Sequence, residues 1–172
     1  MEIGGSGMGR EAEGAGGLFV EDGVPCLTQR TLAPMGAWHL LLGCVMLNQT
    51  HRRQARPAVE AILAAAAGPE EFAAAPDGPI AAALLPCGLA TRRLAVLRAM
   101  TEAHLAGEHV LKLPGLGPYA WDSYDIFALG ALLGPEDVGD LSLRPFLIGA
   151  HAGRWAAPPR MPYARRGSGR PG

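Results

Sequence analysis

The sequence predicts a single all-α domain, and three observations support that fold class. Hydrophobic residues make up 49% of the chain but aromatic residues only 6%, and alanine is abundant throughout, a balance that favours helices over sheets. No segment alternates apolar and polar residues over the length of a strand. At 172 residues the chain is long enough for one well-buried domain and too short for two of ordinary size.

We expect the folded unit to comprise residues 32–150. The first 31 residues begin with a stretch, 1–17, that holds seven glycines and few large apolar side chains. Residues 151–172 hold prolines among glycines and arginines. Segments of this composition bury too little apolar surface to become ordered, so 1–31 and 151–172 are predicted to be disordered tails.

Hydrophobic spacing predicts the helices within this unit in order. Residues 36–47 are apolar on almost every face and should form the central buried helix. Apolar residues follow helical spacing over 55–66, where Pro57 indicates that the first turn lies nearby. Two short helices are expected at 70–75 and 79–85.

The second half of the domain is predicted to hold two longer helices. Thr91 is expected to cap a helix that runs through Leu105. The last predicted helix runs from Tyr119 to about residue 133, with Asp122 and Asp125 on a solvated face.

A glycine-rich segment precedes that last helix, and residues 111–127 together predict a tight hairpin opening directly into it. Gly115 and Gly117 supply backbone freedom for a sharp turn that lies close to another backbone. Amide N–H groups at the turn and the positive end of the helix dipole then form an anion site that needs no basic side chain. A DNA phosphate is the expected ligand, although the same hairpin also fits a plain helix–helix turn.

Charge and cysteine content narrow the class of protein. The formal net charge of −1 excludes nucleic-acid binding by bulk electrostatics alone, but six arginines follow the last acidic residue, Asp140. They form either a solvated basic tail or one that contacts phosphates. Three cysteines and five histidines without metal-ligand spacing predict no disulfide framework, metal site or four-cysteine iron–sulfur cluster. Without a long apolar run or a signal pattern, we expect a cytoplasmic protein with no membrane partner.

Five short motifs occur in order, and with the segment after Asp140 they extend over about 110 residues. They are Trp38-His39-Leu40-Leu41, Leu47-Asn48-Gln49-Thr50 with Pro57 seven residues on, Leu84-Leu85-Pro86-Cys87-Gly88-Leu89, the hairpin, and Asp122-Ser123-Tyr124-Asp125-Ile126-Phe127. Together they resemble the helix-hairpin-helix DNA glycosylases (HhH-GPD superfamily), and within them the thymine glycosylase domain of the methyl-CpG-binding type. The resemblance implies a two-lobed helical fold with the substrate base in the cleft between the lobes, no iron–sulfur cluster, no cofactor, and a monomer acting on double-stranded DNA.

The family's catalytic aspartate lies a little over 20 residues beyond the hairpin, and the resemblance leaves two candidates. Asp140 is followed by a leucine at the third position and an aromatic residue at the sixth, as in the family. Asp137 instead completes the segment Pro-Glu-Asp, another local resemblance to the family, and is the second choice for the catalytic aspartate. Pro145 and Gly149 depart from the family, because they interrupt the regular helix expected behind the aspartate.

Tyr119 stands where strand-cutting members of the family carry a lysine that forms a Schiff base with the sugar. A tyrosine cannot do this, so the resemblance implies a monofunctional enzyme. Tyr119 would contact the flipped pyrimidine or be a core aromatic residue. Gln49 would hydrogen-bond the orphan base or be a solvent-facing turn residue. Leu89 would fill the gap in the base stack or pack against the core.

The resemblance also implies which groups hold the DNA backbone. The hairpin residues Gly115, Leu116 and Gly117 would bind it through main-chain amides. Seven basic side chains either contact phosphates or are simply solvated: Arg52, Arg53, Arg56, Arg92, Arg93, Arg98 and Lys112.

The implied function is that of a base-excision-repair enzyme, a DNA N-glycosylase without lyase activity. It would flip out a mispaired or damaged pyrimidine, thymine or uracil opposite guanine, and remove it with water to leave an abasic site. An ionised aspartate would stabilise positive charge on the sugar and help activate the water. The alternatives are a noncatalytic helix-hairpin-helix DNA-binding module, an inactive glycosylase remnant, or a helical protein-interaction domain.

Overall fold

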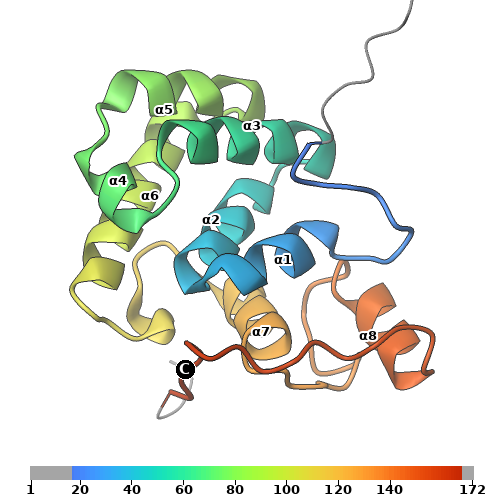
Figure 1. Ribbon diagram of the computed structural model, residues 1–172. Helices are drawn as coiled ribbons and strands as arrows, with labels where there is room; N and C mark the ends of the chain where they lie inside the picture. The colour runs from blue at the N-terminus through green and yellow to red at the C-terminus, as the bar shows by residue number, and fades with distance from the viewer. Residues whose placement is uncertain (1–16, 168–172) are drawn as a thin grey trace, which may run out of the picture.

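A computed structural model describes residues 17–167, and every regular element within that range is helical (Figure 1). The predicted all-α fold class is therefore confirmed for this part of the chain. Residues 1–16 and 168–172, which belong to the two predicted tails, lie outside the described residues. None of the helices in the described range combines the length and the apolar content needed to cross a membrane.

Helix α2, Ala37–Leu47, is the central element of the fold. Almost all of its side chains are buried, as predicted for 36–47, because they are apolar on every face. It contacts α1 (Leu27–Leu32), α3 (Arg52–Ala65), α6 (Ala90–Leu105) and α7 (Pro118–Phe127). The hydrophobic core is thus built around one helix.

Two groups of helices flank α2 (Figure 1). In the first, α3 packs on α5 (Asp77–Leu84), and both α5 and α4 (Pro69–Ala74) pack on α6. In the second, α1 contacts α7, and α8 (Arg144–His151) lies beyond them at the lower right of the view. Residues 17–167 also contain three short 3₁₀ helices: η1 at Ala33–Met35, η2 at Leu85–Cys87 and η3 at Val110–Lys112.

Several helix ends differ from the prediction. Helix α3 begins at Arg52, so the exposed Pro57 lies in its second turn rather than near its start. Helix α6 begins at Ala90, and its N-cap is Leu89 rather than Thr91. Helix α7 stops at Phe127 instead of near residue 133, because the chain turns at Gly130.

The turn at Gly130 makes room for the C-terminal segment. A Cβ atom at this position would lie 2.8 Å from the carbonyl oxygen of Pro158, and the Met161 amide donates to the Ala128 carbonyl at 2.7 Å. Further anchors are the Trp155 indole, which donates to the Phe146 carbonyl at 2.8 Å, and the Tyr163 hydroxyl, which donates to the Ala33 carbonyl at 2.6 Å. The chain beyond residue 150 is therefore packed against the fold through residue 164, which corrects the predicted tail 151–172.

The predicted N-terminal tail, 1–31, also extends too far. Helix α1 begins inside it, and Leu27, Thr28 and Gln29 are buried. Pro145 and Gly149, which depart from the pattern of the family that the sequence resembles, have local explanations in α8 as well. Pro145 occupies the first turn, where a missing N–H is tolerated, and a Cβ atom on Gly149 would lie 1.9 Å from the Trp155 ring.

Candidate functional site

A cavity of about 640 Å³ is lined by residues from both helix groups. Its walls are the segment before α1, α1 itself, the loop between α2 and α3, the first turns of α3 and α7, and the segment 140–145. The volume falls in the range of roughly 300–1,000 Å³ that is usual for small-molecule sites. Residues far apart in sequence therefore converge on one concave surface.

Three of the predicted site residues, Gln49, Tyr119 and Asp140, line this cavity. Asp137, the alternative aspartate, does not line it and is exposed in the turn before Val138. Leu89 and the hairpin glycines also lie outside the lining. The geometry thus brings the preferred aspartate, and not the fallback, to the same cavity as Tyr119.

Asp140 is held by its own local turn. Its Oδ1 atom accepts the Ser142 backbone N–H at 2.7 Å and also the Ser142 hydroxyl. Within residues 17–167 the structure records no hydrogen bond to Oδ2. One carboxylate oxygen is therefore fixed while the other has capacity for a partner in the cavity.

Tyr119 lies in the first turn of α7, and its hydroxyl accepts a hydrogen bond from Gln29 Nε2 at 2.6 Å. Burial raises the pKa of Tyr119 well above its ordinary value, and Cys44, Cys26 and Asp140 act in the same direction. The hydroxyl therefore stays protonated in neutral solution and can donate a hydrogen bond into the cavity. Tyr119 is half-buried: it packs against the hydrophobic core and also lines the cavity, so it combines features of both expected roles.

Gln29 is a site residue that the sequence analysis missed. It is only 3% exposed, lines the cavity and orients the Tyr119 hydroxyl. It lies within the predicted tail 1–31, so its role was hidden by the wrong domain boundary. Its neighbours Thr28 and Arg30 are polar as well, so the local sequence gives no signal that Gln29 is buried at a cavity.

The hairpin before α7 has one glycine that its conformation requires. Gly115 takes φ 73°, and a Cβ atom there would lie 2.5 Å from Val96 Cγ1 of α6. Gly117 is extended, with φ −136°, and a Cβ atom there would meet nothing within 4 Å. The expectation that both glycines provide turning freedom is therefore wrong for Gly117, whose surroundings are open.

Main-chain amides are available at this hairpin. In the described part of the chain, the N–H groups of Gly115, Leu116 and Gly117 donate no backbone hydrogen bond. Pro118 follows as the first residue of α7, so the helix start adds its dipole to the same corner. This is the arrangement that binds an anion without basic side chains.

Gln49 and Leu89 share an unusual backbone conformation. Their φ angles are 55° and 54°, and Cys26 at 59° is the only other non-glycine residue with positive φ in the described range. Residues held in this region cluster at functional sites. Leu89 is 56% exposed, so its alternative role as a core leucine is wrong, and Gln49 is exposed at the edge of the cavity.

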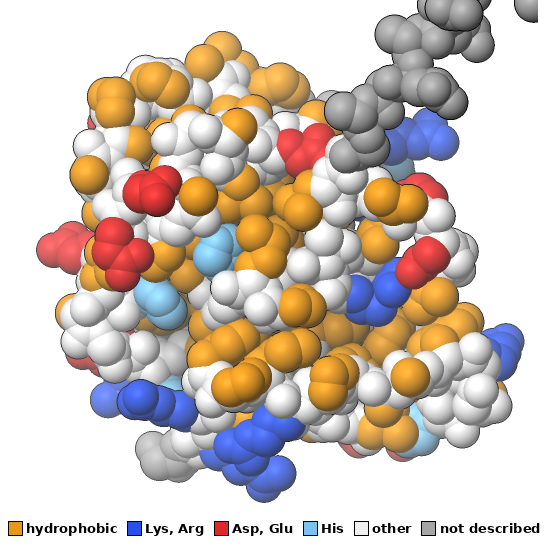
Figure 2. Space-filling model, viewed as in Figure 1, with side chains coloured by type: hydrophobic (Ala, Val, Ile, Leu, Met, Phe, Trp, Pro, Cys, Tyr) orange, Lys and Arg blue, Asp and Glu red, His pale blue; other side chains and the backbone are white. Residues whose placement is uncertain are grey.

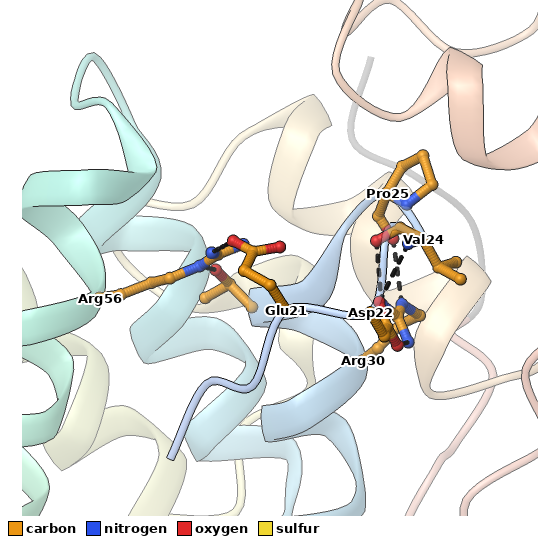
Figure 3. Close-up of polar contacts among 7 residues, drawn as sticks. Glu21, Asp22, Val24, Pro25, Arg30 and Arg56 are labelled. Atoms are coloured by element: carbon orange, nitrogen blue, oxygen red, sulfur yellow. Dashed lines mark hydrogen bonds and ion pairs between the residues drawn. The ribbon is translucent and has the colours of Figure 1, made fainter. Parts of the chain in front are cut away.

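Residues 21–26, which precede α1, form a segment that we call the strap, and all of them except Asp22 line the cavity. Figure 3 shows the polar contacts that attach it. The Arg30 guanidinium donates to both carboxylate oxygens of Asp22 and to the carbonyls of Val24 and Pro25. The hydrogen bond from the Arg30 guanidinium, followed by the one that the Val24 backbone N–H donates to Asp22, lowers the pKa of Asp22 to about 2. The strap is therefore fastened to α1 by a single arginine side chain.

A second arginine fastens the other end of the strap. Arg56, from α3, donates to the Glu21 carboxylate and to the Thr28 hydroxyl (Figure 3). Glu21 precedes α1 and Arg56 belongs to the first helix group, so this ion pair joins the strap to α3, and both of its residues line the cavity. Arg56 is thereby already paired in the structure.

The seven side chains predicted to contact phosphates or be simply solvated fall into three sets. Arg93 is only 6% exposed, and Arg98 is bound to Asp77 and to the carbonyls of Phe72 and Ala75, so neither alternative holds for these two. Arg56 is paired with Glu21. The remaining four are exposed: Arg52, Arg53, Arg92 and Lys112. Figure 2 shows basic side chains gathered along the lower edge of one face, near the C-terminal segment, and acidic ones mainly elsewhere, so a net charge of −1 conceals an uneven distribution.

Comparisons with protein-family models and with curated proteins gave no match to this chain. Among residues 17–167, no group of three or more His, Cys, Asp or Glu side chains is arranged to hold a metal ion. The candidate site is therefore defined by the cavity, the hairpin beside it and the two left-handed loops.

Proposed function

We propose that this chain is a monofunctional DNA glycosylase of the two-lobed helix-hairpin-helix class, and that it removes thymine or uracil mispaired with guanine. The observation that carries the proposal is the convergence of Asp140, Tyr119, Gln29 and Gln49 on one cavity, with the hairpin leading directly into the helix that bears Tyr119. The cavity, lined from both helix groups, is the base pocket.

Binding begins at the backbone of the damaged strand. The amides of Gly115, Leu116 and Gly117 hold a phosphate, and the open space at Gly117 lets the DNA backbone approach closely. The exposed apolar side chain of Leu89 enters the base stack and Gln49 contacts the orphan guanine. Extruding the nucleotide costs a few kcal/mol, and less when the pair is mismatched, which accounts for mismatch preference.

The extruded pyrimidine is read by neutral hydrogen-bonding groups. Thymine and uracil present two carbonyl oxygens and an N–H on their pairing edge. The protonated Tyr119 hydroxyl, oriented by Gln29, donates to one of these carbonyls. A neutral tyrosine in a desolvated wall binds such a base without removing a proton from it.

The reaction breaks the bond between C1′ of the sugar and the base nitrogen. The base leaves with the bonding electrons and takes a proton from solvent, while positive charge develops on the sugar. The Asp140 carboxylate stabilises that charge, and its Oδ2 atom accepts a proton from the water that attacks C1′. Ser142 keeps the other oxygen fixed throughout.

The abasic site is left intact because no lysine reaches the cavity. The chain has a single lysine, Lys112, which is exposed at the end of η3 and does not line the cavity. Strand cutting by this class of enzyme needs an amine that forms a Schiff base with the sugar. Borohydride added during the reaction should therefore trap no protein–DNA adduct.

The test is excision from a duplex with one G·T or G·U pair. Strands should break only after alkali, which cleaves the abasic product. Asp140→Asn should lower the single-turnover rate at least about 100-fold, since one electrostatic stabiliser typically contributes that much, while salt-dependent binding persists. Asp137→Asn is the matched control and should react like the unmodified protein.

Other outcomes have definite meanings. Salt-dependent DNA binding with no excision of either base would establish the noncatalytic binding module instead. An absence of DNA affinity would point to the helical interaction domain. Loss of activity in Asp137→Asn, with Asp140→Asn still active, would transfer the catalytic role to Asp137.

A further inference from the structure

Arg93 makes an unusual set of hydrogen bonds. It lies in the first turn of α6 and is 6% exposed. Its guanidinium donates to the carbonyls of Val45 at 2.7 Å and Asn48 at 2.8 Å, and to the Thr50 hydroxyl. Its Nε donates to the Gly88 carbonyl at 3.1 Å. All three guanidinium nitrogens therefore donate hydrogen bonds, to backbone carbonyls and to one hydroxyl.

These acceptors belong to the two loops with left-handed residues. Asn48 and Thr50 flank Gln49, and Gly88 immediately precedes Leu89. The Thr50 hydroxyl also lies 3.4 Å from the Cys87 carbonyl, which adds a second, weaker link between the same loops. Arg93 is therefore the main polar connection between the backbone around Gln49 and the backbone around Leu89.

The charge of Arg93 is offset without a carboxylate. The ion pairs recorded in the described chain involve Arg30, Arg56 and Arg98, and none involves Arg93. Its partners include carbonyls at the C-terminal end of α2, where the helix dipole is negative. Burial of this cation is offset by its hydrogen bonds, and the planar guanidinium that makes several of them at once is not reproduced by a lysine ammonium.

We propose that Arg93 is a positioning residue, which sets the distance between Gln49 and Leu89 so that both reach the opened base pair together. The inference rests on the proposed function. Positive φ angles at both residues are strained, and such strain persists only where the surroundings hold it. Arg93 supplies that hold from the protein interior and touches neither substrate nor the reacting atoms.

The test is a double-mutant cycle on single-turnover excision from a G·U duplex. Arg93→Lys keeps the charge but loses the fork, and should slow excision by about tenfold, the effect expected for losing a charged hydrogen bond. In a Gln49→Ala/Leu89→Ala background, the same change should slow the residual reaction by less than about twofold, because the groups it positions are gone.

Arg98→Lys is the matched control. Arg98 lies in the same helix and is likewise bound to carbonyls, those of Phe72 and Ala75, but it contacts neither loop. It should lower thermal stability comparably while leaving the excision rate within about twofold. All rates are taken below the unfolding midpoint of every variant, determined by circular dichroism.

Three results would overturn the inference. Equal slowing by Arg93→Lys in both backgrounds would show a general structural effect, and no slowing in the otherwise unmodified protein would show that the fork is dispensable. An equal effect of Arg98→Lys on the excision rate would also remove the distinction. If the unmodified protein excises neither base, the proposed function itself fails, and this inference with it.

Discussion

Gly115 and Gly117 look equivalent in the sequence but meet different requirements in the fold. Gly115 combines a left-handed backbone with a contact to Val96 that leaves no room for a Cβ atom. Gly117 has ordinary extended backbone and open space around it. The first glycine is therefore required by the fold, whereas nothing in the fold requires a glycine at the second position.

Alanine substitutions should separate the two roles. Gly115→Ala should lower the free energy of unfolding by about 2 kcal/mol or more, from the left-handed backbone and overpacking against Val96. Gly117→Ala should change it by less than about 0.5 kcal/mol but weaken duplex binding. Urea unfolding and fluorescence-anisotropy titration measure both quantities. A large loss of stability in Gly117→Ala would contradict this account.

Individual side chains were predicted best where a motif constrained them. Tyr119 and Asp140 were found from the hairpin and the residues after it, and both line the cavity. Asp122 was expected on a solvated face, yet it is only 2% exposed, because α7 is covered on more sides than its spacing suggests. Gln29 and Arg93 belong to no motif, and only their tertiary partners reveal them.

At the scale of elements, apolar spacing located helices more reliably than it located their ends. The interior of α2 is uniformly apolar, so its burial could be predicted without knowing its partners. The start of α6 is capped by a left-handed leucine with no side-chain hydrogen bond, which no capping rule anticipates. The end of α7 depends on a C-terminal segment that crosses Gly130, so local pattern could not place it.

The strap is the element whose attachment should respond to pH. The folded-state pKa of Asp22 is lowered to about 2, chiefly by its hydrogen bond from Arg30. A lowered pKa means that the attachment is fully present above the ordinary aspartate value near 4 and is lost as pH falls through about 2. The Val24 amide, which donates to Asp22 Oδ1 at 3.0 Å, reports on this contact.

Hydrogen exchange at Val24 should therefore keep its protection factor from pH 7 down to about pH 4, and lose it toward pH 2. Arg30→Gln should abolish that protection at every pH, because a neutral amide cannot hold the carboxylate. Loss of protection already near pH 5 in the unmodified protein would contradict the assigned pKa shift. Amides in the middle of α2 are the internal reference.

Across the whole molecule, the largest gap in the prediction concerned the two ends of the domain. The hydroxyl of Tyr163 bonds to Ala33, and Cys26 Sγ lies 3.5 Å from the Ser142 carbonyl, so both ends are joined to distant parts of the chain. Composition alone predicts disorder for such segments because it records no long-range contacts. Contacts from Arg30 and Arg56 anchor the N-terminal segment, and Trp155 and Tyr163 anchor the C-terminal one.

Trp155 should be the main anchor of the C-terminal segment. Its ring stacks on Phe146 at a centroid distance of 6.1 Å and fills the space beside Gly149. Trp155→Ala should lower the free energy of unfolding by about 2–3 kcal/mol, somewhat less than for a fully buried tryptophan. It should also slow excision, because α8 begins four residues after Asp140.

Arg154→Ala is the control for that experiment. Arg154 is exposed and only lies over the Trp155 ring, so its loss should change stability by less than about 1 kcal/mol. Thermal unfolding and the alkali assay would be run on both variants. If Trp155→Ala unfolds at the same temperature as the unmodified protein, the segment contributes no anchoring.

Lys112 is the only lysine in the sequence, and this has a practical consequence. An amine-reactive dye can attach to only one side chain in this protein, and that side chain is solvent-exposed at the end of η3, three residues before Gly115. Near neutral pH the dye reacts mainly with the terminal α-amine, because its pKa is lower than that of a lysine. At higher pH the Lys112 amine loses its proton and is labelled as well. Such a conjugate carries a fluorophore at the corner where the duplex is proposed to dock, so its emission would follow association in real time.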